Sequence, residues 1–203
     1  PSCENDQTPK TYSNSVDLEV GTYYLDISKN GSSTGKYTIG VNFAASNSND
    51  VEPNNGTLTA QPINLNSSPI TGYISWNDDQ DTYKIVLPNA GKININMISS
   101  ISYVNVNLKD TDGNQIFSDY PSCENDQTPK TYSNSVDLEP GTYYLSISKN
   151  GSSTGKYTIG VNFTSSNSND VEPNNGTLTS QPINLNSNPI TGYISWNDDQ
   201  DTY

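Results

Sequence analysis

The amino-acid sequence predicts an all-β fold, an antiparallel jelly-roll-like β-sandwich that recurs in tandem repeats of about 120 residues. Three observations support this prediction. Apolar and polar residues alternate with a period of two along many short segments. These segments are rich in Thr, Tyr, Val and Ile, which favour strands. Turn-forming Pro, Gly, Asn and Asp separate them, and no segment shows the 3.6-residue period of an amphipathic helix.

In each of the expected strands the alternation places the apolar residues on one face. The clearest segments are 83–87, 92–97, 104–108, 142–147 and 157–163. Turns are expected at 88–91, 110–113, 139–141 and 150–155. Because each strand has a single apolar face, two antiparallel sheets are expected to pack face to face.

An internal repeat defines the domain organisation. Residues 1–83 recur as residues 121–203, an offset of 120, with only six differences. The small, polar segments 44–49 and 164–169 are typical of linkers. One complete β-sandwich repeat is therefore expected at 50–163, which is the usual size of one domain. Residues 1–43 are expected to be the C-terminal part of a preceding repeat, and residues 170–203 the N-terminal part of a following one.

Composition excludes several classes of function. The chain contains no histidine, so a Ser-His-Asp triad, a Cys-His dyad and a histidine metal site are all excluded. A net charge of −13 repels the phosphate backbone, so no nucleic-acid partner is expected. The apolar runs are far shorter than the about 20 residues of a membrane helix, so no membrane insertion is expected. Carboxylates abound, but none is expected at an apolar strand position that would raise its pKa for catalysis, so the protein is predicted not to be an enzyme.

Two segments combine acidic and amide side chains, Asp-Val-Glu-Pro-Asn-Asn at 50–55 and Asp-Asp-Gln-Asp-Thr-Tyr at 78–83. Oxygen ligands without His or Cys suit a hard cation such as calcium, which takes about six to eight of them. If the fold brings the two segments together, they form a calcium site. From the spacing alone, a solvated acidic loop is an equally good interpretation.

A series of motifs follows in order along the complete repeat: Glu52-Pro-Asn54-Asn55, Ile70-Thr-Gly72-Tyr-Ile74, Asp79-Gln-Asp81-Thr-Tyr83, Gly91-Lys-Ile93, Leu108-Lys-Asp110-Thr-Asp112-Gly113-Asn114, Gly141-Thr-Tyr143-Tyr144-Leu145 and Gly155-Lys-Tyr157-Thr-Ile159. With these motifs the repeat resembles the bacterial pre-peptidase C-terminal (PPC) domain family, which includes the collagen-binding domains of clostridial collagenases. The resemblance implies a jelly-roll-like sandwich that is a non-catalytic accessory module of exported proteins. It also implies a secreted or cell-surface location.

In calcium-binding members of that family, the Glu-Pro-Asn segment and the later acidic loop hold the metal together. The resemblance therefore implies calcium ligands at Asp50, Glu52, Asn54, Asn55, Asp78 and Asp81, and in the second copy at Asp170, Glu172, Asn174, Asn175, Asp198 and Asp201. Asp50 departs from the pattern, because the calcium binders tend to carry Glu there.

Exposed aromatic residues are candidates for ligand binding. Collagen-binding relatives use tyrosines on one sheet, and Tyr24 and Tyr144 fall on the face opposite the core residues. Trp76 and Trp196 precede the acidic loops. Either they stack on a sugar ring or they close the end of the sandwich.

Each copy of the repeat contains one cysteine, Cys3 or Cys123, so a repeat cannot close an internal disulfide. Two interpretations stay open: a disulfide between units or chains, and a free thiol.

Two functions fit these features. The first is a non-catalytic extracellular protein with a structural or adhesive role, stabilised by calcium and assembling end to end into a homopolymeric fibre as chains complete one another's partial repeats. The alternative is a targeting module of a secreted hydrolase that binds collagen or a polysaccharide. Near-identical copies favour the first, and the family resemblance favours the second.

Overall fold

A computed structural model describes residues 9–32, 34–122 and 128–203. Nine β-strands lie within these residues: β1 (Gln61–Pro62), β2 (Ile70–Ile74), β3 (Gln80–Leu87), β4 (Gly91–Ser99), β5 (Val104–Asp110), β6 (Gln115–Asp119), β7 (Lys130–Leu138), β8 (Gly141–Lys149) and β9 (Gly155–Ser165). No helix in the described part of the chain is long and apolar enough to cross a membrane.

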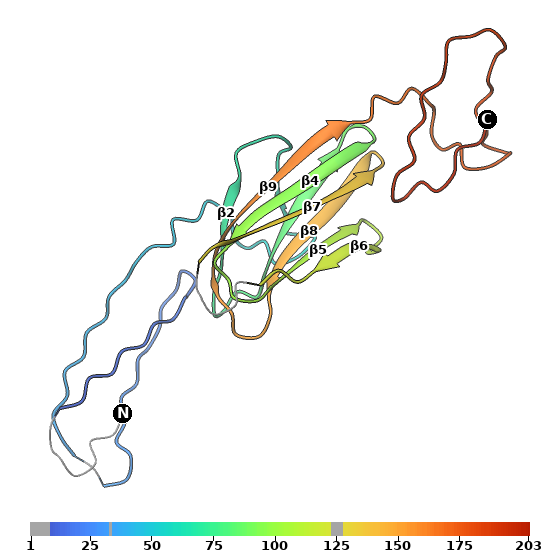
Figure 1. Ribbon diagram of the computed structural model, residues 1–203. Helices are drawn as coiled ribbons and strands as arrows, with labels where there is room; N and C mark the ends of the chain where they lie inside the picture. The colour runs from blue at the N-terminus through green and yellow to red at the C-terminus, as the bar shows by residue number, and fades with distance from the viewer. Residues whose placement is uncertain (1–8, 33, 123–127) are drawn as a thin grey trace.

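The strands form two sheets that pack face to face (Figure 1). One sheet has the order β1-β3-β8-β5-β6, and the other has the order β2-β9-β4-β7. The predicted all-β sandwich is confirmed. One pair departs from the antiparallel expectation, because the chain leaves the first sheet after β1, forms β2 in the other sheet and returns as β3 parallel to β1.

Alternating side chains from both sheets fill the space between them. The expected inward-facing residues are buried, among them Tyr83, Ile85, Leu87, Ile93, Ile95, Met97, Val104, Val106, Leu108, Tyr143, Leu145, Ile147, Tyr157, Ile159 and Val161. The rings of Tyr83 and Tyr157 meet edge to face in this core, with centroids 6.5 Å apart. The strand pattern read from the sequence is therefore the pattern of the core.

The partial copies show how strongly the strands depend on their neighbours. Residues 10–18, 21–29 and 35–45 repeat the sequences of β7, β8 and β9 almost without change, yet they form no strand in the described residues. Leu25 is 65 % exposed, whereas its counterpart Leu145 is fully buried. In the complete repeat these strands pair with β4 and β5, and the 203 residues hold no second copy of that sequence.

Strand β9 extends into the segment that was expected to be a linker. The strand continues to Ser165, two residues into the segment 164–169, because Thr164 and Ser165 pair with Lys92 and Gly91 of β4. The remaining repeat boundaries stay predictions.

Gly72 of β2 lies directly against the ring of Tyr157, and a Cβ added there would come within 2.3 Å of the Tyr157 ring and hydroxyl. We expect Gly72→Ala to destabilise the repeat by about 2–3 kcal/mol, because the buried tyrosine has nowhere to move. Gly160→Ala on β9 is the matched control. Its Cβ would meet Pro69 at 3.5 Å, an ordinary contact, so the change should stay within about 0.5 kcal/mol. Urea unfolding of both variants tests this, and equal stability of the two would contradict it.

Candidate metal centre

The two acidic segments meet at the beginning of β3. The backbone N–H of Thr82 donates a hydrogen bond of 2.8 Å to the Asn54 carbonyl, which holds the first segment against the strand. As a result, carboxylate oxygens of Asp50, Glu52 and Asp81 lie within 4.8 Å of one another. The fold therefore brings the two acidic segments together, as a calcium site requires.

Asp81 is the buried member of this group. It is fully buried on β3, and its Oδ2 accepts a hydrogen bond from the hydroxyl of Tyr157. Tyr157 in turn accepts a hydrogen bond of 2.6 Å from Tyr83, since its own proton is already donated. Asp81 Oδ1 has no hydrogen-bond partner among the described residues.

Burial, with repulsion from the neighbouring carboxylates, raises the pKa of Asp81 to about 9. The expectation that no carboxylate occupies an apolar strand position is therefore wrong. Asp81 lies two residues before Tyr83, so the period-two pattern places it on the same inward face as Tyr83, Ile85 and Leu87. That signal was present in the sequence.

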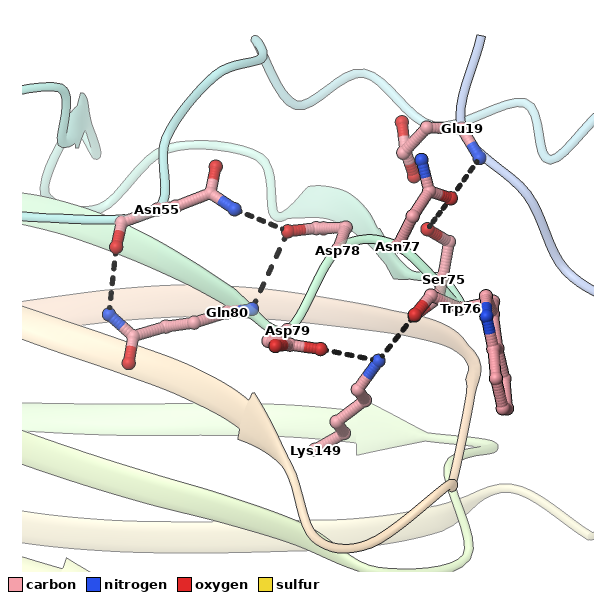
Figure 2. Close-up of polar contacts among 9 residues, drawn as sticks. All are labelled: Glu19, Asn55, Ser75, Trp76, Asn77, Asp78, Asp79, Gln80 and Lys149. Carbon is pink, nitrogen blue, oxygen red and sulfur yellow. Dashed lines mark hydrogen bonds and ion pairs between the residues drawn. The ribbon is translucent and has the colours of Figure 1, made fainter. Parts of the chain in front are cut away.

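Asp78, the first acidic residue of the second segment, lies outside this group of three carboxylates. Its Oδ1 accepts a hydrogen bond of 2.7 Å from the Asn55 side chain, and the Gln80 side chain holds the Asn55 carbonyl at 3.1 Å (Figure 2). Burial and the charge of Glu52 raise the pKa of Asp78 to about 6. Asp78 Oδ2 and both polar atoms of the fully buried Asn54 side chain find no partner within the described part of the chain.

These residues fit a calcium ion. Buried polar atoms in folded proteins are nearly always hydrogen-bonded, so several unpartnered buried oxygens beside three carboxylates indicate a missing positive partner. The donors are all oxygens, as a hard cation prefers.

The second copy builds the same arrangement without the surrounding strands. Carboxylate oxygens of Asp170, Glu172 and Asp201 again lie within 4.8 Å of one another. The Asn175 side chain donates to Asp198 at 2.6 Å, and Asn174 is fully buried. The local sequence is therefore sufficient to gather the acidic residues.

The candidate ligand-binding aromatics lie apart from the metal centre. Trp76 and Trp196 are 61 % and 42 % exposed, so neither ring is packed inside the sandwich. In Figure 2 the indole ring of Trp76 points away from the polar contacts. Tyr144 lies on β8, whereas Tyr24 is 90 % exposed in a segment without strands. Cys3 and Cys123 lie outside the described residues.

Lys149, at the end of β8, is a residue that the motif search missed. Its Nζ lies 2.5 Å from a carboxylate oxygen of Asp79 and donates to the carbonyls of Ser75 and Trp76 (Figure 2). It thereby fixes the loop between β2 and β3 that carries the acidic residues. Only the register of β8 against β3 shows this role.

Comparison with known proteins gives one curated relative. The chain is 29 % identical to Collagenase ColA of Clostridium perfringens in an alignment of 156 residues that covers 71 % of this chain and 14 % of the collagenase. No protein-family model matches the chain. The resemblance to clostridial collagenases that the motifs predicted is confirmed by this similarity.

Solved structures give weaker matches. The pre-peptidase C-terminal domain of collagenase from Bacillus anthracis has 24 % identity and a TM-score of 0.42, covering 50 % of this chain and 93 % of that domain. A carbohydrate-binding module of the Cellvibrio mixtus lichenase 5A, solved with cellotriose, has 16 % identity and a TM-score of 0.34, covering 48 % of this chain and 88 % of the module.

Tyr157→Phe removes the hydroxyl that joins Tyr83 to Asp81. We expect a loss of about 1–3 kcal/mol in unfolding free energy, because a buried carboxylate oxygen and a buried phenol both lose a partner. Tyr103→Phe is the control, since that ring is 47 % exposed at the surface. Thermal and urea unfolding of the two variants measure the difference, and an unchanged stability of Tyr157→Phe would refute the role assigned to the hydroxyl.

Proposed function

We propose that this chain is a non-catalytic, extracellular targeting module that binds collagen. The observation that carries the proposal is the similarity to a collagenase over 71 % of this chain. Because the matched residues are only 14 % of the collagenase, the resemblance supports a module of such a protein and not its hydrolytic activity.

The outer face of the five-stranded sheet offers a suitable surface. Tyr144 of β8 lies between Lys84 of β3 and Lys109 of β5, which are its partners in the two neighbouring strands. Aromatic rings bind proline-rich polyproline-II chains, and collagen is wound from three such chains. In a chain of net charge −13, the two lysines also make this face locally less negative.

Tyr144→Ala should reduce binding to triple-helical collagen peptides by about tenfold or more without loss of stability, because loss of an aromatic contact at the centre of an interface costs about 2 kcal/mol. Surface plasmon resonance on immobilised collagen measures this. Ser133→Ala, on the exposed face of β7 in the other sheet, is the control. Binding to polysaccharide but not to collagen, lost in Trp76→Ala, would overturn the choice of ligand.

We further propose that calcium is the cation of the acidic centre. The unpartnered oxygens of Asn54, Asp78 and Asp81 support it. Burial, and to a lesser degree repulsion from the neighbouring carboxylates, raises the pKa of Asp81 to about 9. A bound cation offsets that repulsion and completes the missing interactions, so it stabilises the folded repeat.

Calcium should therefore raise the melting temperature, and at about 100 times the Kd the stabilisation should be about 2.7 kcal/mol. Asp81→Asn should abolish this shift, because it removes the buried carboxylate at the centre of the group. Asp112→Asn, in the exposed β5–β6 turn, removes the same charge elsewhere and should retain the shift. Calorimetry with EDTA and with calcium separates these outcomes, and an equal shift in both variants would place the ion elsewhere.

A structural role with end-to-end assembly into a homopolymer stays a prediction. One observation favours it: the apolar residues of the partial copies are exposed where the same residues of the complete repeat are buried, as with Val41 and Val161 at 81 % and 1 %.

A further inference from the structure

Consecutive repeats meet through one set of contacts that occurs twice in the chain. Asp17 of the preceding repeat accepts from the backbone N–H of Trp76 at 2.9 Å through its carbonyl, and from the hydroxyl of Tyr73 through its carboxylate. Exactly 120 positions later, Asp137 does the same with Trp196 at 2.8 Å and with Tyr193. The junction is thus a repeated interface that both copies form in the same way.

The next contacts direct a glutamate of the preceding repeat to the acidic loop of the following one. The backbone N–H of Glu19 donates to the Asn77 side chain at 3.2 Å (Figure 2), and that of Glu139 donates to Asn197 at the same distance. Asn77 and Asn197 directly precede Asp78 and Asp198 of the two candidate metal centres.

A tyrosine hydroxyl fixes each of these glutamates from the other side. Tyr23 donates to the Glu19 carbonyl at 2.7 Å, and Tyr143 donates to the Glu139 carbonyl at 2.8 Å. In turn the amide groups of Asn77 and Asn197 donate to these hydroxyls at 3.4 Å. The glutamate backbone is therefore held between the two repeats, next to the acidic loop of the following one.

The carboxylate of Glu139 faces the acidic residues of the following repeat. It lines a cleft of about 410 Å³ together with Asp170, Glu172 and Tyr193. Its Oε1 is buried and has no hydrogen-bond partner in the described residues. Burial, and the negative charges of Asp198, Asp170 and Asp201, raise the pKa of Glu139.

The first junction places its glutamate in the same way, because Asn77 and Tyr23 make the contacts with Glu19 that Asn197 and Tyr143 make with Glu139. Two acidic groups would repel each other across an interface, so their approach at both junctions calls for a positive charge between them.

We propose that the calcium site is shared between repeats: Glu19 completes the centre formed by Asp50, Glu52 and Asp81, and Glu139 completes the centre formed by Asp170, Glu172 and Asp201. The inference rests on the calcium site proposed above and adds a ligand from the preceding repeat. Calcium takes about six to eight oxygens, and a further carboxylate beside this group supplies both a ligand and a negative charge. Calcium then fixes the orientation of one repeat on the next.

Terbium, a luminescent substitute for calcium, tests this in the whole 203-residue chain. Lifetimes measured in H₂O and D₂O count the water molecules on the bound ion. The double variant Glu19→Gln/Glu139→Gln keeps the side-chain size and every backbone hydrogen bond of the junction. We expect it to bind terbium about tenfold more weakly and to leave about one more water on each ion than the unmodified chain does.

Asp112→Asn, which removes a carboxylate from the β5–β6 turn, is the control and should change neither number. If the double variant matches the unmodified chain in affinity and hydration while Asp81→Asn loses ion binding at the first centre, the calcium site stands and the shared ligand is refuted. If the unmodified chain takes up no ion, both proposals fail.

Small-angle X-ray scattering supplies a second readout. Calcium should narrow the distribution of end-to-end distances in the unmodified chain and should leave it unchanged in the double variant. The same narrowing in both would refute the glutamates as the link between repeats.

Discussion

The buried carboxylate of Asp81 is the constraint on which the rest of the repeat depends. Its oxygen ends a hydrogen-bonded chain through Tyr157 of one sheet and Tyr83 of the other, so the two layers of the sandwich are tied together at the point where the acidic loop begins. Gly72 must be small because Tyr157 needs the space. The unpartnered Oδ1 of Asp81 leaves this buried carboxylate one interaction short, and a cation at the acidic centre would supply it. The packing of the core and the chemistry of the acidic centre therefore depend on the same residues.

Sequence reasoning could predict the strands because each has a clear period of two, and it could predict the acidic residues because they cluster along the chain. It could not predict which oxygens lack partners. Asn54 is fully buried with both polar atoms unpaired, yet in the sequence it is one amide among many. Lys149 and Asp79 are 70 positions apart and meet only through the pairing of β8 with β3. The burial of Asp81, by contrast, follows from the same alternation that predicts the burial of Tyr83 and Ile85.

Comparison of the near-identical copies distinguishes structure that the local sequence determines from structure that depends on tertiary contacts. The segments that form β7, β8 and β9 in the complete repeat form no strand in the partial copy, because pairing and burial stabilise strands far more than intrinsic preference does. The group of three carboxylates persists in both copies, although Asp81 accepts from Tyr157 and Asp201 from Tyr203. The junction contacts persist with equivalent partners and nearly the same distances. The gathering of the acidic residues and the contacts of the junction therefore do not require a complete sandwich on both sides.

The junction between one repeat and the next is formed by few residues. None of the six differences between the copies falls on a residue of the acidic centre or on the aspartate, glutamate, tyrosines, tryptophan or asparagine of the junction. The nearest difference, Val20 against Pro140, follows the glutamate directly, and Val20 is fully exposed. A joint made of one hairpin turn and one loop buries too little apolar surface to be rigid by itself. The proposed divalent ion would join carboxylates of both repeats at one point, so the stiffness of the joint would depend on the supply of calcium.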